Sequence, residues 1–270
     1  TRSSMTKGRE SMSEYPLLEF DNVSLEFPAT GELVLRDVSL TINDGEFVAI
    51  VGPSGSGKTT FLRLAHGLLH PTAGQIRMSG ERVIKPNRER AFVFQADSLL
   101  PWRSILDNVA YPAEIAGKKR SVAREMAEPF VELVGLAAYK SSYPAQLSGG
   151  MRQRVNLARA LSANPRILLM DEPFGALDAQ TREVMQDELL RIWQAQRKTV
   201  LFVTHQLDEA VFLADRVIVL GAHPGFIKKD ITIEIDRPRA LEAKRTAKFN
   251  KYVEEIWELI KTDVFVDRSN

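Results

Sequence analysis

The sequence predicts an α/β fold with a parallel-sheet core, an antiparallel β subdomain and an inserted helical subdomain. Alternating segments separated by turn-like PATGE and NDGE predict antiparallel strands over residues 17–48. Residues 104–160 contain no convincing strand, so we expect a helical subdomain over about 96–162. The parallel core is predicted from short apolar runs typical of strands buried on both faces: EFVAIVG, RILLMDE, TVLFVTH and RVIVLG.

Composition narrows the class of protein. A chain of 270 residues with 44% hydrophobic content can bury a substantial core. Its 36 basic and 35 acidic residues give no electrostatic reason to expect a nucleic-acid partner. The absence of cysteine excludes disulfide scaffolds and thiol catalysis. No apolar run approaches a bilayer span, so we expect a cytoplasmic protein, with residues 1–15 as a disordered tail.

A phosphate-binding loop directly follows the strand EFVAIV. The segment GPSGSGKT matches G-x-x-x-x-G-K-[ST], in which backbone amides wrap phosphate oxygens. Lys58 is expected to reach the β and γ phosphates, and the Thr59 hydroxyl to bind Mg²⁺. The third glycine of a dinucleotide fingerprint is missing, which weakens a Rossmann interpretation. The candidate nucleotide-binding residues here are Gly52, Pro53, Ser54, Gly55, Ser56, Gly57, Lys58, Thr59 and Thr60.

Carboxylates end a second buried strand, RILLMDE. Ligands of open α/β sheets gather at the carboxyl ends of strands, where Asp171 and Glu172 stand. Adjacent strand residues point to opposite sides, so we assign Asp171 to the Mg²⁺ shell and Glu172 to polarising the attacking water. His205 ends the next run, TVLFVTH, and is either a γ-phosphate contact or a structural histidine.

A second anion-binding element is predicted at LSGGMRQRVNLARAL, residues 147–161. Ser148 is expected to cap a helix whose first amides, unobstructed at Gly149 and Gly150, point toward an anion.

The histidine pair His66 and His70 has the spacing of zinc ligands but lacks the glutamate of H-E-x-x-H. We interpret that pair as helix surface.

Together these motifs resemble the ATP-binding cassette (ABC) family over about residues 17–239. The resemblance implies a P-loop NTPase (RecA-like) core, with the ATPase domain at 16–240, binding ATP and Mg²⁺. It further implies that Phe27 stacks on adenine, Gln95 senses Mg²⁺ and the attacking water, Asp178 lies at the subunit contact, and His205 holds the γ-phosphate. Without the resemblance, Phe27 is equally compatible with the core. The segments that carry the resemblance are the phosphate loop, LSGGM, ILLMDE, ALD and VTH.

The resemblance also implies a head-to-tail dimer. Ser148, Gly149 and Gly150 of one copy would contact the γ-phosphate held by Lys58 of the other, so that ATP joins the two subunits. The sequence departs from the commonest pattern at Met151, where glutamine is usual. A thioether cannot replace the amide's hydrogen bonds.

Three further segments resemble the ATPase subunits of bacterial nitrate, sulfonate and taurine importers: FQADSLLPWRSILDN, FGALDAQTRE and LGAHPGFIKKDITIEIDRPR. This resemblance implies transmembrane permease subunits, an indirect solute-binding protein, no nucleic acid, and a peripheral location on the inner face of the cell membrane. The apolar cluster at residues 99–102 is either a docking site for a permease helix or buried within the helical subdomain.

Two other functions stay open at this point: a soluble cassette protein acting on nucleic acid or ribosomes, and an exporter or lipid-handling ATPase. The last segment, residues 241–270, predicts a helix and tail. Its apolar side chains recur at helical spacing and favour packing on the chain's own domain, with a partner surface as the alternative. These side chains are Phe249, Val253, Ile256, Trp257 and Ile260.

Overall fold

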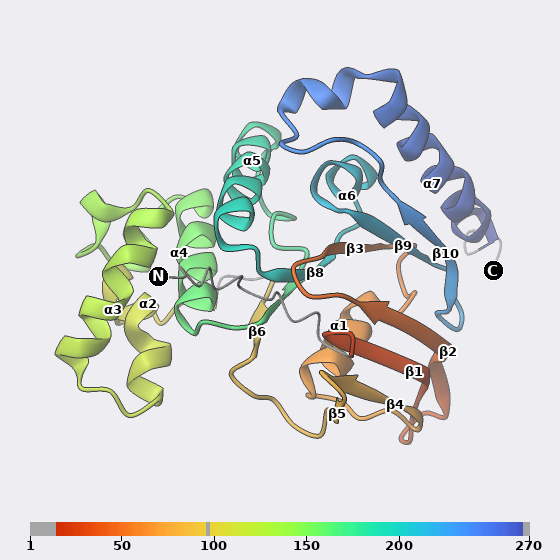
Figure 1. Ribbon diagram of the computed structural model, residues 1–270, viewed down its shortest axis with the longest axis horizontal. Helices are drawn as coiled ribbons and strands as arrows, with labels where there is room; N and C mark the ends of the chain where they lie inside the picture. The colour runs from red at the N-terminus through yellow and green to blue at the C-terminus, as the bar shows by residue number, and fades with distance from the viewer. Residues whose placement is uncertain (1–14, 96–97, 267–270) are drawn as a thin grey trace, which may run out of the picture.

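The computed structural model describes residues 15–95 and 98–266, with side chains described as far as Asp263. Its centre is a six-stranded sheet in the order β10-β9-β3-β8-β7-β6 (Figure 1). All neighbouring strands are parallel except β10, which pairs with β9 in the antiparallel sense. The strands are β3 (Phe47–Val51), β6 (Arg90–Val93), β7 (Ile167–Asp171), β8 (Thr199–Val203), β9 (Arg216–Leu220) and β10 (Ile227–Thr232).

The apolar runs of the sequence form the middle of this sheet. Every residue of β3, β7 and β8 is buried, which confirms the predicted parallel core. Side chains of β3 alternate between two hydrophobic clusters, since Val48 and Ile50 pack with Phe61 on one face. Phe47, Ala49 and Val51 belong to the cluster on the other face. Both faces are therefore covered, as a parallel sheet requires.

A second, antiparallel sheet with the order β2-β1-β4-β5 lies beneath the core in Figure 1. It confirms the predicted β subdomain, and it adds two strands that the alternation at residues 17–48 does not cover. Helix α1 (Lys58–His66) lies between the two sheets and fills the shared cluster. The strands are β1 (Leu18–Phe27), β2 (Glu32–Ile42), β4 (Ala73–Met78) and β5 (Glu81–Arg82).

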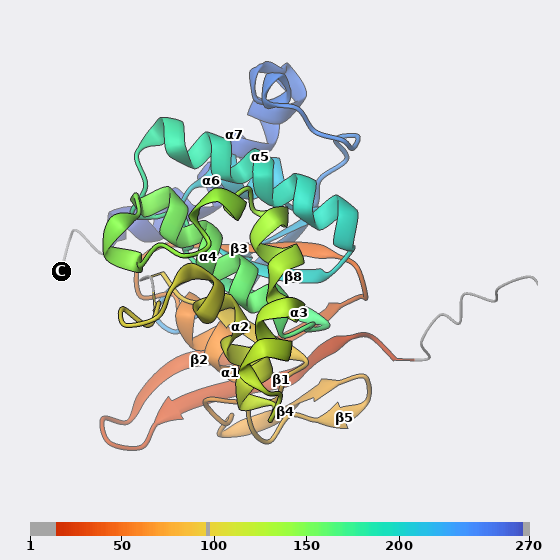
Figure 2. The ribbon, with the colours of Figure 1, turned by 90° about the vertical axis from the view of Figure 1, so that its left-hand side faces the viewer.

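The segment between β6 and β7 is helical, as predicted, and extends to one side of the sheet in Figure 1; Figure 2 looks at the molecule from that side, with these helices in front. The predicted start of this subdomain, residue 96, lies outside the described residues. Ser104 and Ser148 accept hydrogen bonds from the amides of Asp107 and Met151, so each caps its helix. The elements are α2 (Ile105–Ile115), α3 (Arg120–Leu133), α4 (Gly149–Ser162) and the 3₁₀ turns Ala137–Tyr139 and Pro144–Gln146.

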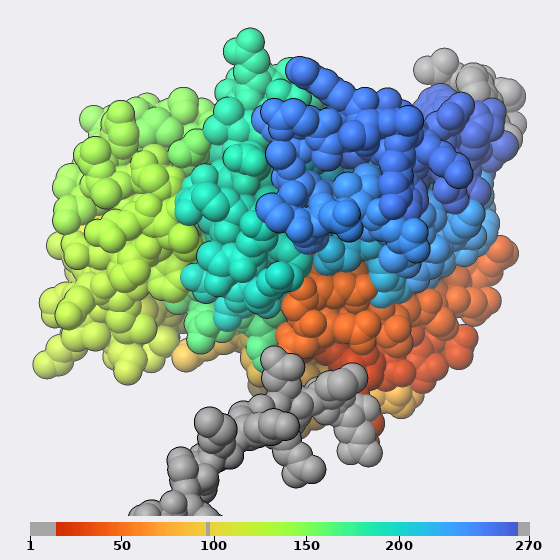
Figure 3. All heavy atoms as spheres, turned by 45° about the horizontal axis from the view of Figure 1, so that its top comes forward, coloured from red at the N-terminus to blue at the C-terminus, as the bar shows by residue number. Residues whose placement is uncertain are grey.

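Two helices connect the later strands, α5 (Ala179–Gln196) and α6 (Leu207–Leu213), and lie on the face of the sheet opposite α1 (Figure 1). After β10 come a 3₁₀ turn, Leu241–Arg245, and the terminal helix α7 (Ala247–Val266). Figure 3 shows this last segment spread over the outside of the core, beside α5. Of the tail predicted at residues 1–15, only Tyr15 lies within the described residues.

The terminal helix confirms most of the predicted apolar stripe. Phe249, Ile256 and Ile260 are buried in the core cluster, and Val253 packs against it. Trp257, however, is 45% exposed, so its place in the stripe was wrong. It follows Ile256 by about 100° around the helix, which turns its ring away from α6 and β9.

The histidine pair does not share a helix surface as predicted. Helix α1 ends at His66 because Gly67 adopts a left-handed conformation, φ 86°, that caps it. His66 is half-buried edge-on to Phe92, and burial lowers its pKa. His70 lies beyond the helix, within 2.6 Å of the Ile84 carbonyl. The described residues contain no group of three or more metal-ligating side chains, and no described helix is long and apolar enough to cross a membrane.

Candidate active site

The predicted phosphate loop joins the carboxyl end of β3 to the start of α1. Residues 52–57 form the loop, and Gly57, with φ 81°, begins the helix at Lys58. This places the first amides of α1 at the sheet edge, where they can meet an anion. Ser54 and Gly55 are exposed, whereas Gly52, Pro53 and Ser56 are buried against the fold.

Lys58 is buried at the base of this loop. Its Nζ donates to the carbonyls of Gly52, at 2.9 Å, and Pro53, at 2.7 Å, which fixes the side chain across the loop. Burial lowers the pKa of Lys58, and the negative charges of Glu172 and Asp171 partly oppose that shift. A phosphate group would add a further negative charge and favour the ammonium form.

The two carboxylates after the buried run have different neighbours. Asp171 ends β7, and its Oδ1 accepts a hydrogen bond from Thr59 Oγ1 at 3.1 Å. Burial raises the pKa of Asp171. A hydroxyl and a buried carboxylate side by side are oxygen donors of the kind Mg²⁺ prefers, so the residues fit the predicted metal, which also favours the charged carboxylate.

Glu172 is the meeting point of two other predicted residues. Its Oε2 lies 3.1 Å from His205 Nδ1 and accepts a hydrogen bond from Gln95 Nε2 at 3.4 Å. Glu172 has φ 44°, a left-handed conformation that is costly for a side chain with a Cβ. Its amide donates to the Val203 carbonyl of β8, which helps to hold that conformation. The structure thus brings together residues from three strand ends.

A cavity of about 410 Å³ opens above the loop. Phe27, half-buried at the end of β1, lines it and also packs against the core cluster of that sheet. Glu32 and Val34 of β2 also line the cavity, and the sequence analysis missed both because nothing in the strand alternation marks them. The other lining residues were predicted: Ser54, Gly55, Gly57, Lys58, Thr59, Thr60 and Glu172.

The LSGG segment is not part of this cavity. Ser148, Gly149 and Gly150 do not appear among its described lining residues. Ser148 is exposed at the start of α4, where its side chain caps the helix. Gly150 is buried and packs closely on α5, since a Cβ at this position would lie only 2.7 Å from Thr181 Cγ2. Within one chain, the predicted anion-binding start of α4 therefore lies outside the cavity above the phosphate loop.

The predicted contact residue Asp178 is exposed at the start of α5, where it accepts from the Thr181 amide at 3.0 Å. Arg182 connects the turn before Asp178 to residues 204–206, the segment that contains His205. This guanidinium donates to the carbonyls of Phe174 and Leu177, and to Gln206 Oε1 at 2.9 Å. Sequence reasoning missed Arg182 because an arginine on a helix carries no signal of such contacts.

A buried carboxylate supports the same histidine segment. Glu209 of α6 accepts hydrogen bonds from the Thr204 hydroxyl and from Gln186 Nε2. Burial raises its pKa. The Thr204 hydroxyl also accepts from the Gln206 amide, so the backbone on both sides of His205 is held in place.

Comparisons with known proteins agree with this geometry. Residues 35–175 match the family described as ABC transporter. The chain is 45% identical to a taurine import ATP-binding protein of Pseudomonas fluorescens, covering 94% of this chain and 96% of that protein. It is 44% identical to a nitrate import ATP-binding protein of Synechocystis, covering 85% and 88%.

A solved structure has the same fold. The dimeric ATP-binding cassette MJ0796, bound to ADP and phosphate, superimposes with a TM-score of 0.70 at 32% identity, covering 81% of this chain and all of that one. The family match spans more than half of the chain, and the relatives cover nearly all of it. The chain therefore belongs to the ABC transporter family, as an ATP-binding subunit.

Proposed function

We propose that this chain is the ATP-hydrolysing subunit of an ABC importer for a small solute such as taurine, a sulfonate or nitrate. The observation that carries the proposal is the cluster at the sheet edge, in which Thr59 meets Asp171 while Glu172 meets His205 and Gln95. Relatives named as taurine and nitrate import proteins support the direction of transport and the class of cargo.

The site residues would divide the hydrolysis between them. Phe27 stacks on adenine at the cavity mouth, and the amides of residues 52–60 bind the phosphates together with Lys58. Glu172 accepts a proton from the attacking water, and His205 holds the γ-phosphate. Thr59, Asp171 and Gln95 would hold Mg²⁺, which would neutralise charge on the phosphates when bound.

A second copy of the chain would complete each site. Ser148, Gly149 and Gly150 lie outside the cavity of their own chain and are free to face the γ-phosphate held by another copy. Asp178, on the exposed turn before α5, would lie at the contact between the copies. The dimeric state of the solved cassette supports this arrangement.

A permease would dock beside the segment at residues 98–102. Leu99 is buried, as the alternative interpretation of this cluster predicts, whereas Trp102 is 72% exposed. Leu100 of the same segment lines a cavity of about 380 Å³ together with Tyr111 and Ile115. An exposed tryptophan on a segment that also lines a cavity is suited to receive a short helix of a membrane protein.

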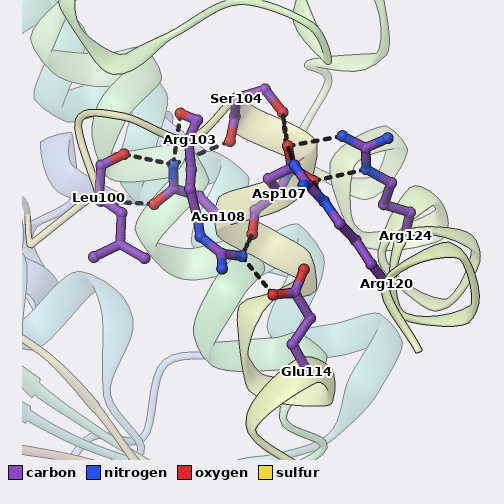
Figure 4. A network of polar contacts seen from close by, with 8 residues as sticks. All are labelled: Leu100, Arg103, Ser104, Asp107, Asn108, Glu114, Arg120 and Arg124. Atoms are coloured by element: carbon purple, nitrogen blue, oxygen red, sulfur yellow. Dashed lines mark hydrogen bonds and ion pairs between the residues drawn. The ribbon is translucent and has the colours of Figure 1, made fainter. Parts of the chain in front are cut away.

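The docking segment is held rigidly (Figure 4). The Asn108 side chain accepts from the Leu100 amide and donates to the carbonyls of Leu100, Arg103 and Ser104. Because Asn108 is fully buried, these bonds are shielded from water. Through the permease, the chain would lie on the inner face of the cell membrane, and a solute-binding protein would deliver the cargo.

Affinity purification of the tagged chain from detergent-solubilised native membranes tests the transport role. We expect a polytopic permease to accompany the wild-type chain and to be reduced for Trp102→Ala. A matched control is Trp257→Ala, which removes an exposed tryptophan on the opposite, terminal helix and should leave recovery unchanged. Recovery of soluble nucleic-acid machinery with both chains, and no permease, would contradict the proposal.

A further inference from the structure

The loop between β9 and β10, residues 221–226, packs directly on the phosphate loop. A Cβ built on Gly225 would lie 2.2 Å from the Ser56 carbonyl oxygen, so the two backbones touch with no side chain between them. Beside this contact, a Cβ on Gly55 would lie 3.2 Å from Cε1 of His223. The loop therefore forms the outer wall against which the phosphate-binding amides rest.

The same loop is fixed to the strand that lines the cavity. The Gly225 amide donates to the Val34 carbonyl, and the Arg36 amide donates to the Gly225 carbonyl, both at 2.9 Å. A displacement of Gly225 would thus disturb Ser56 on one side and β2 on the other. Ser56 belongs to the phosphate loop, and β2 contributes Val34 to the cavity wall.

The terminal helix holds this loop from behind. Asp263, near the end of α7, accepts a hydrogen bond from the Ala222 amide at 3.3 Å through Oδ2. Its Oδ1 accepts from Lys228 Nζ at 2.8 Å, and Lys228 also donates to the Leu259 carbonyl. The Lys228 and Asp263 side chains are only 19% and 23% exposed, so the pair is largely shielded from solvent.

We propose that Asp263 is a positioning residue for ATP, acting through Ala222 and the loop at residues 221–226 to hold the phosphate loop in its binding shape. This inference rests on the proposed function, because it assumes that ATP binds at Lys58. Loss of the carboxylate leaves the Ala222 amide without its acceptor and Lys228 without its counter-charge. The loop at residues 221–226 then becomes more mobile, and so do Gly55 and Ser56, which pack against it and whose amides would bind phosphate.

The chain offers a matched control for this ion pair. Lys229 and Glu255 form a second pair at 2.7 Å between the same two elements, β10 and α7, but they lie toward the solvent and away from the loop. Glu255→Ala therefore removes a similar contact of the terminal helix without touching Ala222. Any general loosening of α7 should affect both variants.

The experiment is to measure the ATP dissociation constant in a Glu172→Gln background, and KM and kcat with Glu172 intact. For Asp263→Ala we expect the dissociation constant and KM to rise about tenfold, with kcat changing by less than about twofold. Lys228→Met should shift them in the same direction by a smaller factor, while Glu255→Ala should leave them unchanged. Hydrogen exchange should quicken in the peptide containing Gly55 and Ser56.

Several results would overturn the inference. An unchanged KM in Asp263→Ala, even with a lowered melting temperature, would mean that Asp263 only stabilises the helix. Equal effects of Asp263→Ala and Glu255→Ala would mean that the shift comes from α7 as a whole. If Asp263→Ala does not fold, Lys228→Met decides the question in the same assay. A wild-type chain that fails to bind ATP would instead refute the proposed function.

Discussion

The sheet-edge cluster and the LSGG segment are both predicted to bind phosphate, yet the structure supports them in opposite ways. At the sheet edge, Thr59 at the start of α1 donates to Asp171 at the end of β7, and Gln95 after β6 donates to Glu172. The LSGG segment consists of one helix start, exposed at Ser148 and held by its own cap. The first region is assembled within the chain, whereas the second is presented outward.

This contrast is what the proposed dimer requires, in which one copy alone would hold an incomplete site. The cavity has donors for phosphate, a carboxylate for water and an aromatic wall, but no described contribution from residues 148–150. A helix N-terminus exposed to solvent attracts an anion only weakly until water is excluded around it. In the proposed dimer, closure of a second copy over the first would supply that exclusion, so ATP would favour the closed dimer by binding it more tightly.

The largest expected effect is on the sheet-edge cluster. Glu172→Gln keeps the side-chain shape but removes the general base, so we expect ATP turnover to fall at least about 100-fold. ATP binding should persist, and the ATP-bound dimer should accumulate in size-exclusion chromatography. Glu32→Gln is the matched control, since it neutralises another carboxylate lining the same cavity and should leave turnover within about threefold. Equal losses would disprove the assignment of the base.

Lys58→Ala removes the cation of the sheet-edge cluster and leaves the LSGG segment unchanged, so it separates the contributions of these two regions to ATP binding. Charge-assisted hydrogen bonds to phosphate contribute about 1.5–3 kcal/mol each, so ATP affinity should fall about 10- to 100-fold. Isothermal titration with ATP measures the loss. Ser148→Ala in the same titration of the monomer should have little effect, because Ser148 does not line the cavity. A comparable loss of ATP affinity in both variants would mean that Lys58 and Ser148 bind ATP within the same chain.

A smaller effect is expected at the LSGG segment itself. Gly150→Ala forces a Cβ against Thr181 Cγ2, and such overpacking, at about 1–3 kcal/mol, should weaken ATP-dependent dimerisation about tenfold while leaving ATP binding to the monomer intact. Adding Thr181→Ser removes the opposing methyl and should restore dimerisation. Analytical ultracentrifugation with ATP and Glu172→Gln checks both variants, and a failure of the second change to rescue would exclude this steric cause.

The smallest effect concerns the stability of the helical subdomain that carries the LSGG segment. Asp107 accepts bonds from Arg120, Arg124 and Ser104, and these hold its pKa well below the usual range (Figure 4). Asp107→Asn should lower the free energy of unfolding by about 2 kcal/mol in urea titrations at neutral pH.

The acid dependence of that stability follows from the same pKa. Because the folded-state value lies below the unfolded one, about 3.9, the contribution of Asp107 is complete above that pH and is lost as the pH falls below it. The difference between wild type and Asp107→Asn should therefore be constant from about pH 6 to 8 and shrink in acid. A difference that grows in acid would contradict this origin.

The sequence predicted which residues meet at the sheet edge because the signals for them are local. A buried run ending in Asp171 and Glu172, and glycines before Lys58, need only neighbours in the chain to be recognised. The contacts of Arg182 with Gln206 and of Asp263 with Ala222 join segments that are far apart in sequence, so no spacing reveals them. The exposure of Trp257 likewise depends on which arc of α7 the core covers.

The most direct test of a site shared between two copies uses the absence of natural cysteine. Ser54→Cys is placed in one preparation and Met151→Cys in another, both with Glu172→Gln, and the two are mixed with ATP and Mg²⁺ under mild oxidation. A disulfide-linked dimer that forms in the mixture, needs ATP, and is absent from either variant alone is the predicted result. No linkage in a mixture that still binds ATP, or equal linkage without ATP, would contradict the head-to-tail arrangement.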